Sequence, residues 1–219
     1  MAINYTKNKF KQVPPGLFND IIKGSGIILK AMDLETLMYD KKDILCGTSG
    51  GITISSKLNN TDYGEDIDNI DPNTKELLQQ DSRTTTVAFS SISATKEMIK
   101  RLAGAADIDA DNEALIKFRS YIESTDFTEL FAAFEKTDGG AVVFHFSNTF
   151  STGGLNFKSE KNGKGTFDCE FTVYKSLVNP DDEGVEVYVY NKPQNTEGEV
   201  EEQSLEYNKQ EDEEGGGLY

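Results

Sequence analysis

The chain of 219 residues has no tryptophan, one histidine and two cysteines. A small secreted scaffold stapled by disulfides would carry more cysteines, so that class is excluded. A zinc site of the usual kind needs several Cys or His side chains together, and His145 with the distant Cys46 and Cys169 does not supply them. The scarcity of both residue types therefore predicts no structural or catalytic metal centre.

Basic residues are also scarce, with 22 Lys and Arg against 38 Asp and Glu and a formal net charge of −16. Affinity for DNA comes largely from Lys and Arg that neutralise phosphates, so this balance argues against direct nucleic-acid binding. It argues equally against an anionic membrane surface. It is compatible with a protein that stays close to DNA without holding it.

Long hydrophobic runs are absent, and none approaches the roughly 20 apolar residues of a membrane span. The segment from Met1 to Phe10 is polar where a signal peptide would have an apolar region. We therefore expect no membrane partner, and we expect synthesis and folding in a cytoplasm.

The signatures of catalysis are missing as well. The sequence has no nucleotide-binding loop, nucleophile elbow or metalloprotease motif. His145 lies between Phe144 and Phe146, and no nearby nucleophile or orienting acid accompanies it. The plainer interpretation of His145 is a structural or exposed strand residue, and we predict no enzyme, no catalytic residue and no cofactor.

One acidic segment begins like a calcium-binding EF-hand loop. Asp107, Asp109 and Asp111 match its first positions, but position six is Asn112 where glycine is needed. Position twelve is Phe118, where a bidentate glutamate is required. The match fails at its most important ligand, so no specific calcium site is predicted.

Alternating apolar and polar residues indicate a protein built mainly from β-strands. The segment 166–175 is the clearest, because Phe167, Cys169, Phe171 and Val173 point one way and polar side chains the other. A period of two with this contrast is typical of a sheet with one buried and one wet face. It also predicts a buried thiol at Cys169.

Further strands are predicted over 21–32, 51–57, 83–93, 141–150 and 185–190. In 141–150 the pattern places Val142, Phe144, Phe146 and Phe150 on one face. In 185–190 it places Val185, Val187 and Val189 opposite Glu186, Tyr188 and Tyr190. Residues 127–134 are compatible with either strand or helix.

One helix is predicted over 94–103 because apolar residues recur there at helical spacing. Ser93 or Thr95 can cap its start, and Gly104 follows its end. A helix lying over a sheet explains this stripe without a functional role.

The chain divides into three parts. Residues 1–20 form an N-terminal arm, broken by Pro14, Pro15 and Gly16, in which the apolar Val13, Leu17 and Phe18 are candidates for anchoring the arm on a neighbouring surface. Residues 21–192 form one β-sandwich domain that includes a long acidic loop over 58–82. Residues 193–219 form a tail with nine acids against Lys209, for which we expect disorder.

A series of short segments resembles the major tail tube protein of bacteriophages with long non-contractile tails, the type found in phages of Gram-positive bacteria. The segments occur in order over roughly residues 10–190. They are VPPGLF at 13–18, GIILK at 26–30, DILCGT at 43–48, GGITI at 50–54, DYGEDID at 62–68, LAGAAD at 102–107 and STGGL at 151–155.

The resemblance implies a mainly β fold with one flanking helix (α+β), in which two packed, roughly orthogonal β-sheets form a near-barrel. It implies hexameric rings of this chain, stacked into a hollow tube of the virion tail through which DNA passes without specific binding. Other implied partners are the tape measure protein and the tail terminator or tip proteins. An acidic lumen would repel DNA phosphates, which agrees with the charge balance.

The resemblance also suggests roles for particular residues. We expect the 58–82 loop to stack one ring on the next and strand carboxylates to line the lumen. The candidates for stacking are Asp62, Tyr63, Glu65, Asp66, Asp68 and Asp71, and those for the lumen are Asp168, Glu170 and Glu186.

Two alternatives remain open. The chain could belong to the tube of a contractile tail or of a secretion-type injection machine, which is also built from stacked rings of one subunit. It could instead be a β-sandwich ligand-binding module that recognises carbohydrate or calcium. The absence of tryptophan weakens the carbohydrate reading, although Tyr188 and Tyr190 are aromatic side chains of the kind that such faces display.

Overall fold

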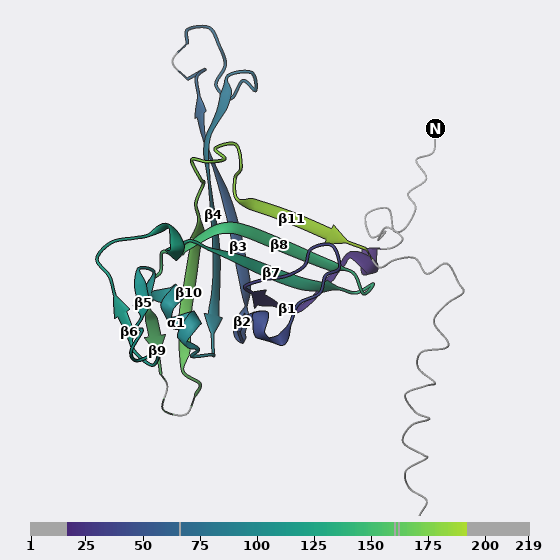
Figure 1. Cartoon of the computed structure of the whole chain (residues 1–219). Coiled ribbons are helices and arrows are strands. Elements are labelled where there is room, and N and C mark those ends of the chain that lie inside the picture. The colour runs from purple at the N-terminus through teal and green to yellow at the C-terminus, as the bar shows by residue number, and fades with distance from the viewer. Residues whose placement is uncertain (1–16, 66, 160, 162, 192–219) are drawn as a thin grey trace, which may run out of the picture.

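The computed structural model describes residues 17–65, 67–159, 161 and 163–191. A nine-stranded antiparallel sheet dominates this part of the chain, in the order β2-β1-β7-β8-β10-β4-β3, with β11 paired to β8 and β9 paired to β10 (Figure 1). The strands of this sheet are β1 (Ile22–Leu29), β2 (Ile44–Cys46), β3 (Thr48–Asp62), β4 (Leu78–Ser91), β7 (Thr128–Lys136), β8 (Ala141–Ser151), β9 (Asn156–Lys158), β10 (Thr166–Val173) and β11 (Val185–Tyr190).

The remaining elements are small. A second sheet pairs β5 (Ala106–Ile108) with β6 (Ile116–Phe118), and α1 (Lys96–Ala103) is the α-helix of the described chain. Three short 3-10 helices are η1 (Leu17–Asp20), η2 (Lys41–Asp43) and η3 (Ser124–Asp126). The prediction of a mainly β protein with one helix is confirmed. None of the described helices is long and apolar enough to cross a membrane.

The large sheet branches at β8. One edge of β8 pairs with β7, while its other edge pairs first with β11 at residues 141–146 and then with β10 at 149–151. Figure 1 shows β3, β4 and β10 running steeply across β7, β8 and β11. The two roughly orthogonal sheets implied by the resemblance are therefore two halves of one hydrogen-bonded sheet, and the described residues form no closed barrel.

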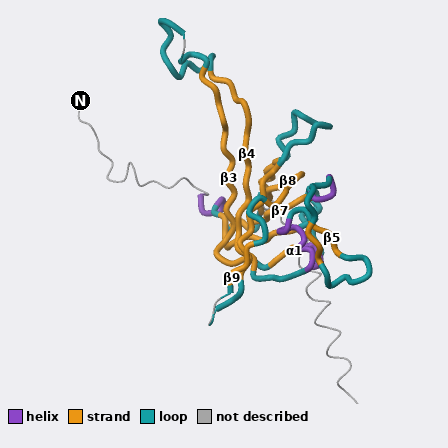
Figure 2. Tube along the Cα trace, turned by 90° about the vertical axis from the view of Figure 1, so that its left-hand side faces the viewer, coloured by secondary structure: helices purple, strands orange, loops and turns teal. Residues whose placement is uncertain are grey.

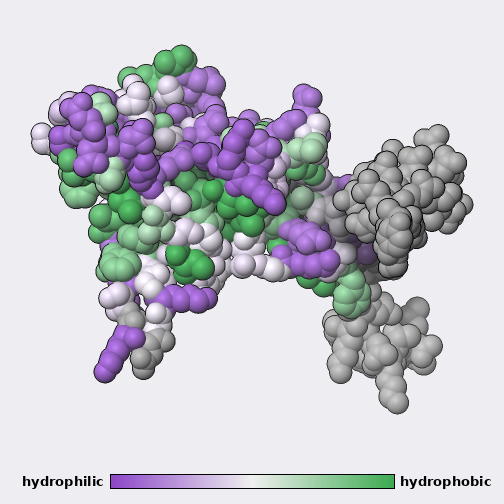
Figure 3. Space-filling model, turned by 60° about the horizontal axis from the view of Figure 1, so that its bottom comes forward, coloured by the Kyte–Doolittle hydropathy of each residue, from purple (hydrophilic) through white to green (hydrophobic). Residues whose placement is uncertain are grey.

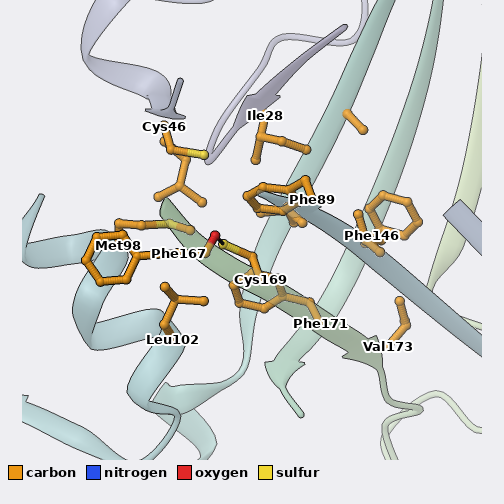
Figure 4. Close-up of a cluster of buried hydrophobic side chains, with 14 residues drawn as sticks. Ile28, Cys46, Phe89, Met98, Leu102, Phe146, Phe167, Cys169, Phe171 and Val173 are labelled. Atoms are coloured by element: carbon orange, nitrogen blue, oxygen red, sulfur yellow. Dashed lines mark hydrogen bonds between the residues drawn. The ribbon is translucent and has the colours of Figure 1, made fainter. Parts of the chain in front are cut away.

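The main core fills one face of this sheet and is closed by α1 (Figure 4). Phe89 and Phe171 lie with their ring centroids 6.0 Å apart, and the helix contributes the fully buried Met98 and Leu102. Cys169 is a free, buried thiol, as predicted, and burial raises its pKa to about 12. Its Sγ donates to the carbonyl of Phe167. The raised pKa keeps the thiol protonated at neutral pH, and a buried protonated thiol is a poor nucleophile.

The helix is held on the sheet by its cap and by one ion-pair network. Thr95, not Ser93, caps it, because the Thr95 hydroxyl accepts from the amide of Met98 over 3.2 Å. Glu97 accepts from Lys30 at the end of β1 and from Arg101 one turn later, at 2.9 and 3.1 Å. Burial alone would raise the pKa of Glu97, but these two cations lower it overall.

A second, smaller core lies on the opposite face of the β1–β7–β8–β11 half. Leu29, Phe131 and Val143 are buried there beneath the segment 32–37, and Tyr190 donates its hydroxyl to the carbonyl of Leu34 over 2.5 Å. The tyrosines of β11 therefore pack inward.

Two facial assignments made from the sequence are wrong. In β11, Val187 and Val189 are 53% and 62% exposed, because the segment 32–37 covers the tyrosine side instead. In β8, the two residues between Phe146 and Thr149 stand opposite the single residue Glu129 of β7, which is a β-bulge. The bulge turns Thr149 toward Val173 and the main core, so Phe150 lies on the opposite face from Phe146.

The segment expected to be a loop over 58–82 is largely a β-hairpin. Strands β3 and β4 remain paired out to Asp62 and Leu78, which leaves residues 63–77 as the loop. Both faces of this ribbon are polar and exposed, so it lacks the apolar alternation by which a strand is recognised. The segment 127–134, left open between strand and helix, is in strand β7 from Thr128.

Candidate assembly surfaces

The outer part of the β3–β4 hairpin projects well clear of the body (Figures 1 and 2). From Ser55 to Thr61 on β3, and from Leu78 to Thr84 on β4, every side chain is exposed. At about 3.3 Å per residue, the projecting pairs extend the strands by roughly 20 Å. A two-stranded ribbon of this kind buries no core and has little stability of its own.

The tip of the hairpin is nevertheless an ordered fold, held by Asp62. The Asp62 carboxylate accepts from the amides of Gly64 and Asn73, at 2.8 and 2.6 Å. Asn69 and Asn73 adopt positive φ angles of 64° at the turns, a conformation that asparagine tolerates well. Of the stacking candidates, Asp62 thus holds the shape of the loop.

The other described stacking candidates are exposed on this tip. Tyr63 is 53% exposed, and Glu65, Asp68 and Asp71 are exposed beside the apolar Ile67 and Ile70. Asp66 lies outside the described residues. The tip therefore presents acidic and apolar side chains together, at the end of an extension.

Two of the lumen candidates lie side by side on β10. Asp168 and Glu170 alternate with the buried Cys169 and Phe171, so both point away from the main core. Ser90 on β4 donates to Asp168 over 3.1 Å. Around them is a wide, open depression lined by Ser49, Gly50, Gly51, Thr53, Ala88, Ser90, Gly153 and Asn156.

The third lumen candidate, Glu186, lies on the same face but on the other half of the sheet. It pairs with His145, whose Nδ1 is 3.1 Å from the Glu186 carboxylate, and Tyr188 donates to that carboxylate over 2.6 Å. The hydrogen bonds from Tyr188 and then His145 lower the pKa of Glu186. His145 in turn stacks on Phe131 with centroids 4.5 Å apart, which makes it a structural strand residue.

Two of the three carboxylates that resembled a calcium loop form ion pairs with basic side chains. Asp107 lies 2.6 Å from Arg119, and Asp109 is paired with Lys117. Among the described residues, no three potential metal ligands are grouped closely enough to hold an ion.

The arm candidates are only partly described. Val13 lies outside the described residues, while Leu17 and Phe18 in η1 are 45% and 69% exposed. The segment is fastened by Lys136, whose ammonium lies 3.0 Å from Asp20 and 2.7 Å from the side-chain oxygen of Asn191. This contact could not be predicted from the sequence, because Lys136 ends β7 and its partners come from distant parts of the chain.

Lys136 is 2% exposed. Its ammonium contacts Asp20 in the first described segment and Asn191 at the end of the last one. The hydrogen bond with Asp20 is the main reason that the pKa of Lys136 is raised. The first and last described segments therefore lie next to each other.

The sheet also has open edges. Within the described residues, β11 pairs with β8 alone and β3 with β4 alone, so each has one unpaired side there. Val187 and Val189 expose apolar surface on β11. Natural proteins cover or pair such edges, and a neighbouring copy is one way of doing so.

Comparisons with known proteins give weak likenesses only. No family model matches the chain, and no curated protein matches it. One solved structure with a similar chain is the virion of a native gene transfer agent particle, at 9% identity and a TM-score of 0.41, with 75% of this chain and 95% of that chain covered.

A second is the tail of an empty gene transfer agent particle, refined helically with C6 symmetry. There the identity is 11% and the TM-score 0.38, with 69% of this chain and 92% of that chain covered. Both TM-scores lie below 0.5, which is too low to assign a function to the chain.

Proposed function

We propose that the chain is a structural subunit of a bacteriophage tail tube, which assembles into stacked hexameric rings around a lumen for DNA. The observation that carries this proposal is the projecting β3–β4 hairpin with its ordered acidic and apolar tip. Residues 55–84, which form the outer part of the hairpin, contribute to neither hydrophobic core, whereas the inner part supplies Val87 and Phe89 to the main core. A segment that is held in shape but buries nothing within its own chain is suited to contact another copy.

Ring closure fits the open edges of the sheet. The unpaired edge of β11 in one copy could contact the unpaired edge of β3 in the next copy, which is a head-to-tail contact between two different surfaces. Contacts of this kind close into a ring when the rotation between neighbouring copies divides a full turn evenly. The number six comes from the resemblance of the sequence to tail tube proteins. The arm 1–20, with Val13, Leu17 and Phe18, would contact an adjacent subunit.

The lumen would be lined by the face that carries Asp168, Glu170 and Glu186. Carboxylates there would repel DNA phosphates, so that DNA slides without being held. The resemblance also implies one continuous barrel around the lumen, which would form when the sheets of neighbouring copies join edge to edge. The further partners would be the tape measure protein and the terminator or tip proteins, and the location would be the virion tail.

Electron microscopy of the purified protein over a range of protein and salt concentrations tests this proposal. Rings or hollow tubes with an open lumen are expected, and higher salt should favour ring formation by screening the net repulsion between subunits that each carry −16. A chain that stays monomeric under all conditions would contradict the proposal and favour the β-sandwich ligand-binding module. Electron microscopy of whole particles that contain the chain, with or without a sheath around the tube, would separate a non-contractile from a contractile tail.

Reversing charges in the depression should make assembled tubes retain DNA. For Asp168→Lys with Glu170→Lys, we expect DNA to co-sediment with tubes at low salt and to be released as salt rises. The matched control is Asp111→Lys with Glu113→Lys, which changes the net charge equally at exposed positions outside the sheet face. Equal DNA retention by both variants would remove Asp168 and Glu170 from the lumen.

A further inference from the structure

The end of the molecule opposite the hairpin tip carries the opposite charge. Figure 1 places the tip at the top and the loop between β9 and β10 at the bottom, and Figure 2 shows the same arrangement after a quarter turn. The sequence of the lower loop, 156–165, contains three lysines and one glutamate. In a chain with 38 acids and 22 basic residues, this loop is an exception.

This lower end is defined here as the foot: Leu155–Lys158, Lys161 and Gly163–Gly165. Its base is ordered, because β9 pairs with β10 and the Phe157 ring packs on Phe167 at a centroid distance of 4.8 Å. Gly165 allows this packing, since a Cβ there would lie 3.0 Å from the Phe157 ring.

The foot and the tip are complementary in two respects. The foot presents exposed Lys161 and Lys164 beside Phe157 and Leu155, which are 56% and 43% exposed. Figure 3, which brings the lower end forward, shows hydrophobic side chains next to a hydrophilic projection. The tip sequence, 63–77, carries five acids against one lysine, and its exposed apolar residues accompany those acids.

We propose that the tip of one copy docks on the foot of a copy in the adjacent ring. This inference rests on the proposed tube function and identifies the partner surface of the hairpin. A head-to-tail contact between two different patches repeats without limit along a stack. Attraction between the acidic tip and the basic foot aligns successive rings in the same orientation. A ring in the reverse orientation would bring tip to tip or foot to foot, and these like charges repel. The apolar side chains within both patches supply the buried area.

Charge reversal on one side at a time tests the pairing. The tip variant is Glu65→Lys with Asp68→Lys, and the foot variant is Lys161→Glu with Lys164→Glu. Each reversal makes tip and foot alike in sign, so we expect the critical concentration for tube growth to rise by about tenfold or more. Light scattering measures that concentration, while electron microscopy counts rings and tubes separately.

Restoration is the decisive readout. A chain with both reversals carries opposite charges again, and its critical concentration should return to within about threefold of the wild-type value. Tip-variant and foot-variant rings mixed together should also form tubes, because each tip then meets a foot of opposite sign. The matched control is Lys41→Glu with Lys42→Glu, which changes two exposed lysines that belong to neither the tip nor the foot and should leave tube growth unchanged.

The outcomes separate this inference from the proposed function. Wild-type tubes together with normal tubes from either one-sided variant would overturn the pairing and leave the tube function standing. Blocked one-sided variants that neither double reversal nor mixing restores would also overturn it. A wild-type chain without rings or tubes would overturn both.

Discussion

Replacing residues 59–82 with Asn-Gly should abolish tube growth and leave a folded subunit. Leu58 and Arg83 are directly paired in the hairpin, so a two-residue turn can join them without changing the register of the remaining ribbon. The removed residues belong to neither hydrophobic core. We therefore expect a melting temperature within about 4 °C of the intact chain, equivalent to about 1 kcal/mol for a domain of this size.

Circular dichroism on heating and electron microscopy together check this result. A suitable control is Asn59→Ala with Ser82→Ala, which removes the side-chain hydrogen bond of 3.0 Å between the two strands but keeps the tip. The control should still form tubes. Long tubes from the shortened chain would remove the hairpin from ring stacking, whereas loss of cooperative melting would mean that the hairpin belongs to the folding unit.

Truncating Phe171 to alanine should cost about 3–5 kcal/mol of unfolding free energy, through lost burial and the cavity left behind. Phe171 is 1% exposed and stacks on Phe89 in the centre of the sheet's main core. A domain is typically stable by only about 5–15 kcal/mol, so this change is expected to unfold a large fraction of the subunit near body temperature. Denaturant titration of the monomer, followed by circular dichroism, measures the difference.

Phe118→Ala is the matched control for that experiment, because it removes the same side chain at a position that is 66% exposed. Its expected effect is within about 0.5 kcal/mol. Equal losses for Phe171 and Phe118 would contradict the position of the core, since only burial distinguishes the two sites.

Local sequence patterns predicted much of the fold. The alternation in 166–175 located β10, its buried face and the thiol of Cys169, because every second residue there meets the same environment. The helix was also predicted from its apolar stripe, the Thr95 cap at its start and Gly104 after its end. These features depend on neighbours within a few residues, so they can be predicted from the local sequence.

The candidate surfaces were predicted less completely. The sequence picked out Asp168, Glu170 and the acidic stretch around Asp68 as exposed groups, and the structure places all three on exposed surface. It could not tell that Asp62 folds the tip, because that role depends on an amide eleven residues away, in Asn73. It also missed Lys136, which meets Asp20 and Asn191 from distant parts of the chain.

By itself, then, the sequence determined the strand-rich class, the single helix, the acidic balance and most of the residues that face the main core. Only the tertiary structure decided that β8 joins both halves of one sheet, that its bulge turns Phe150 away from Phe146, and that Tyr190 packs inward under Leu34. The structure also set the acidic tip and the lysine-bearing foot at opposite ends of the molecule. The physical reason is that these features arise from strand pairing and covering segments far apart in the chain, whereas a local pattern reports only the alternation of one strand.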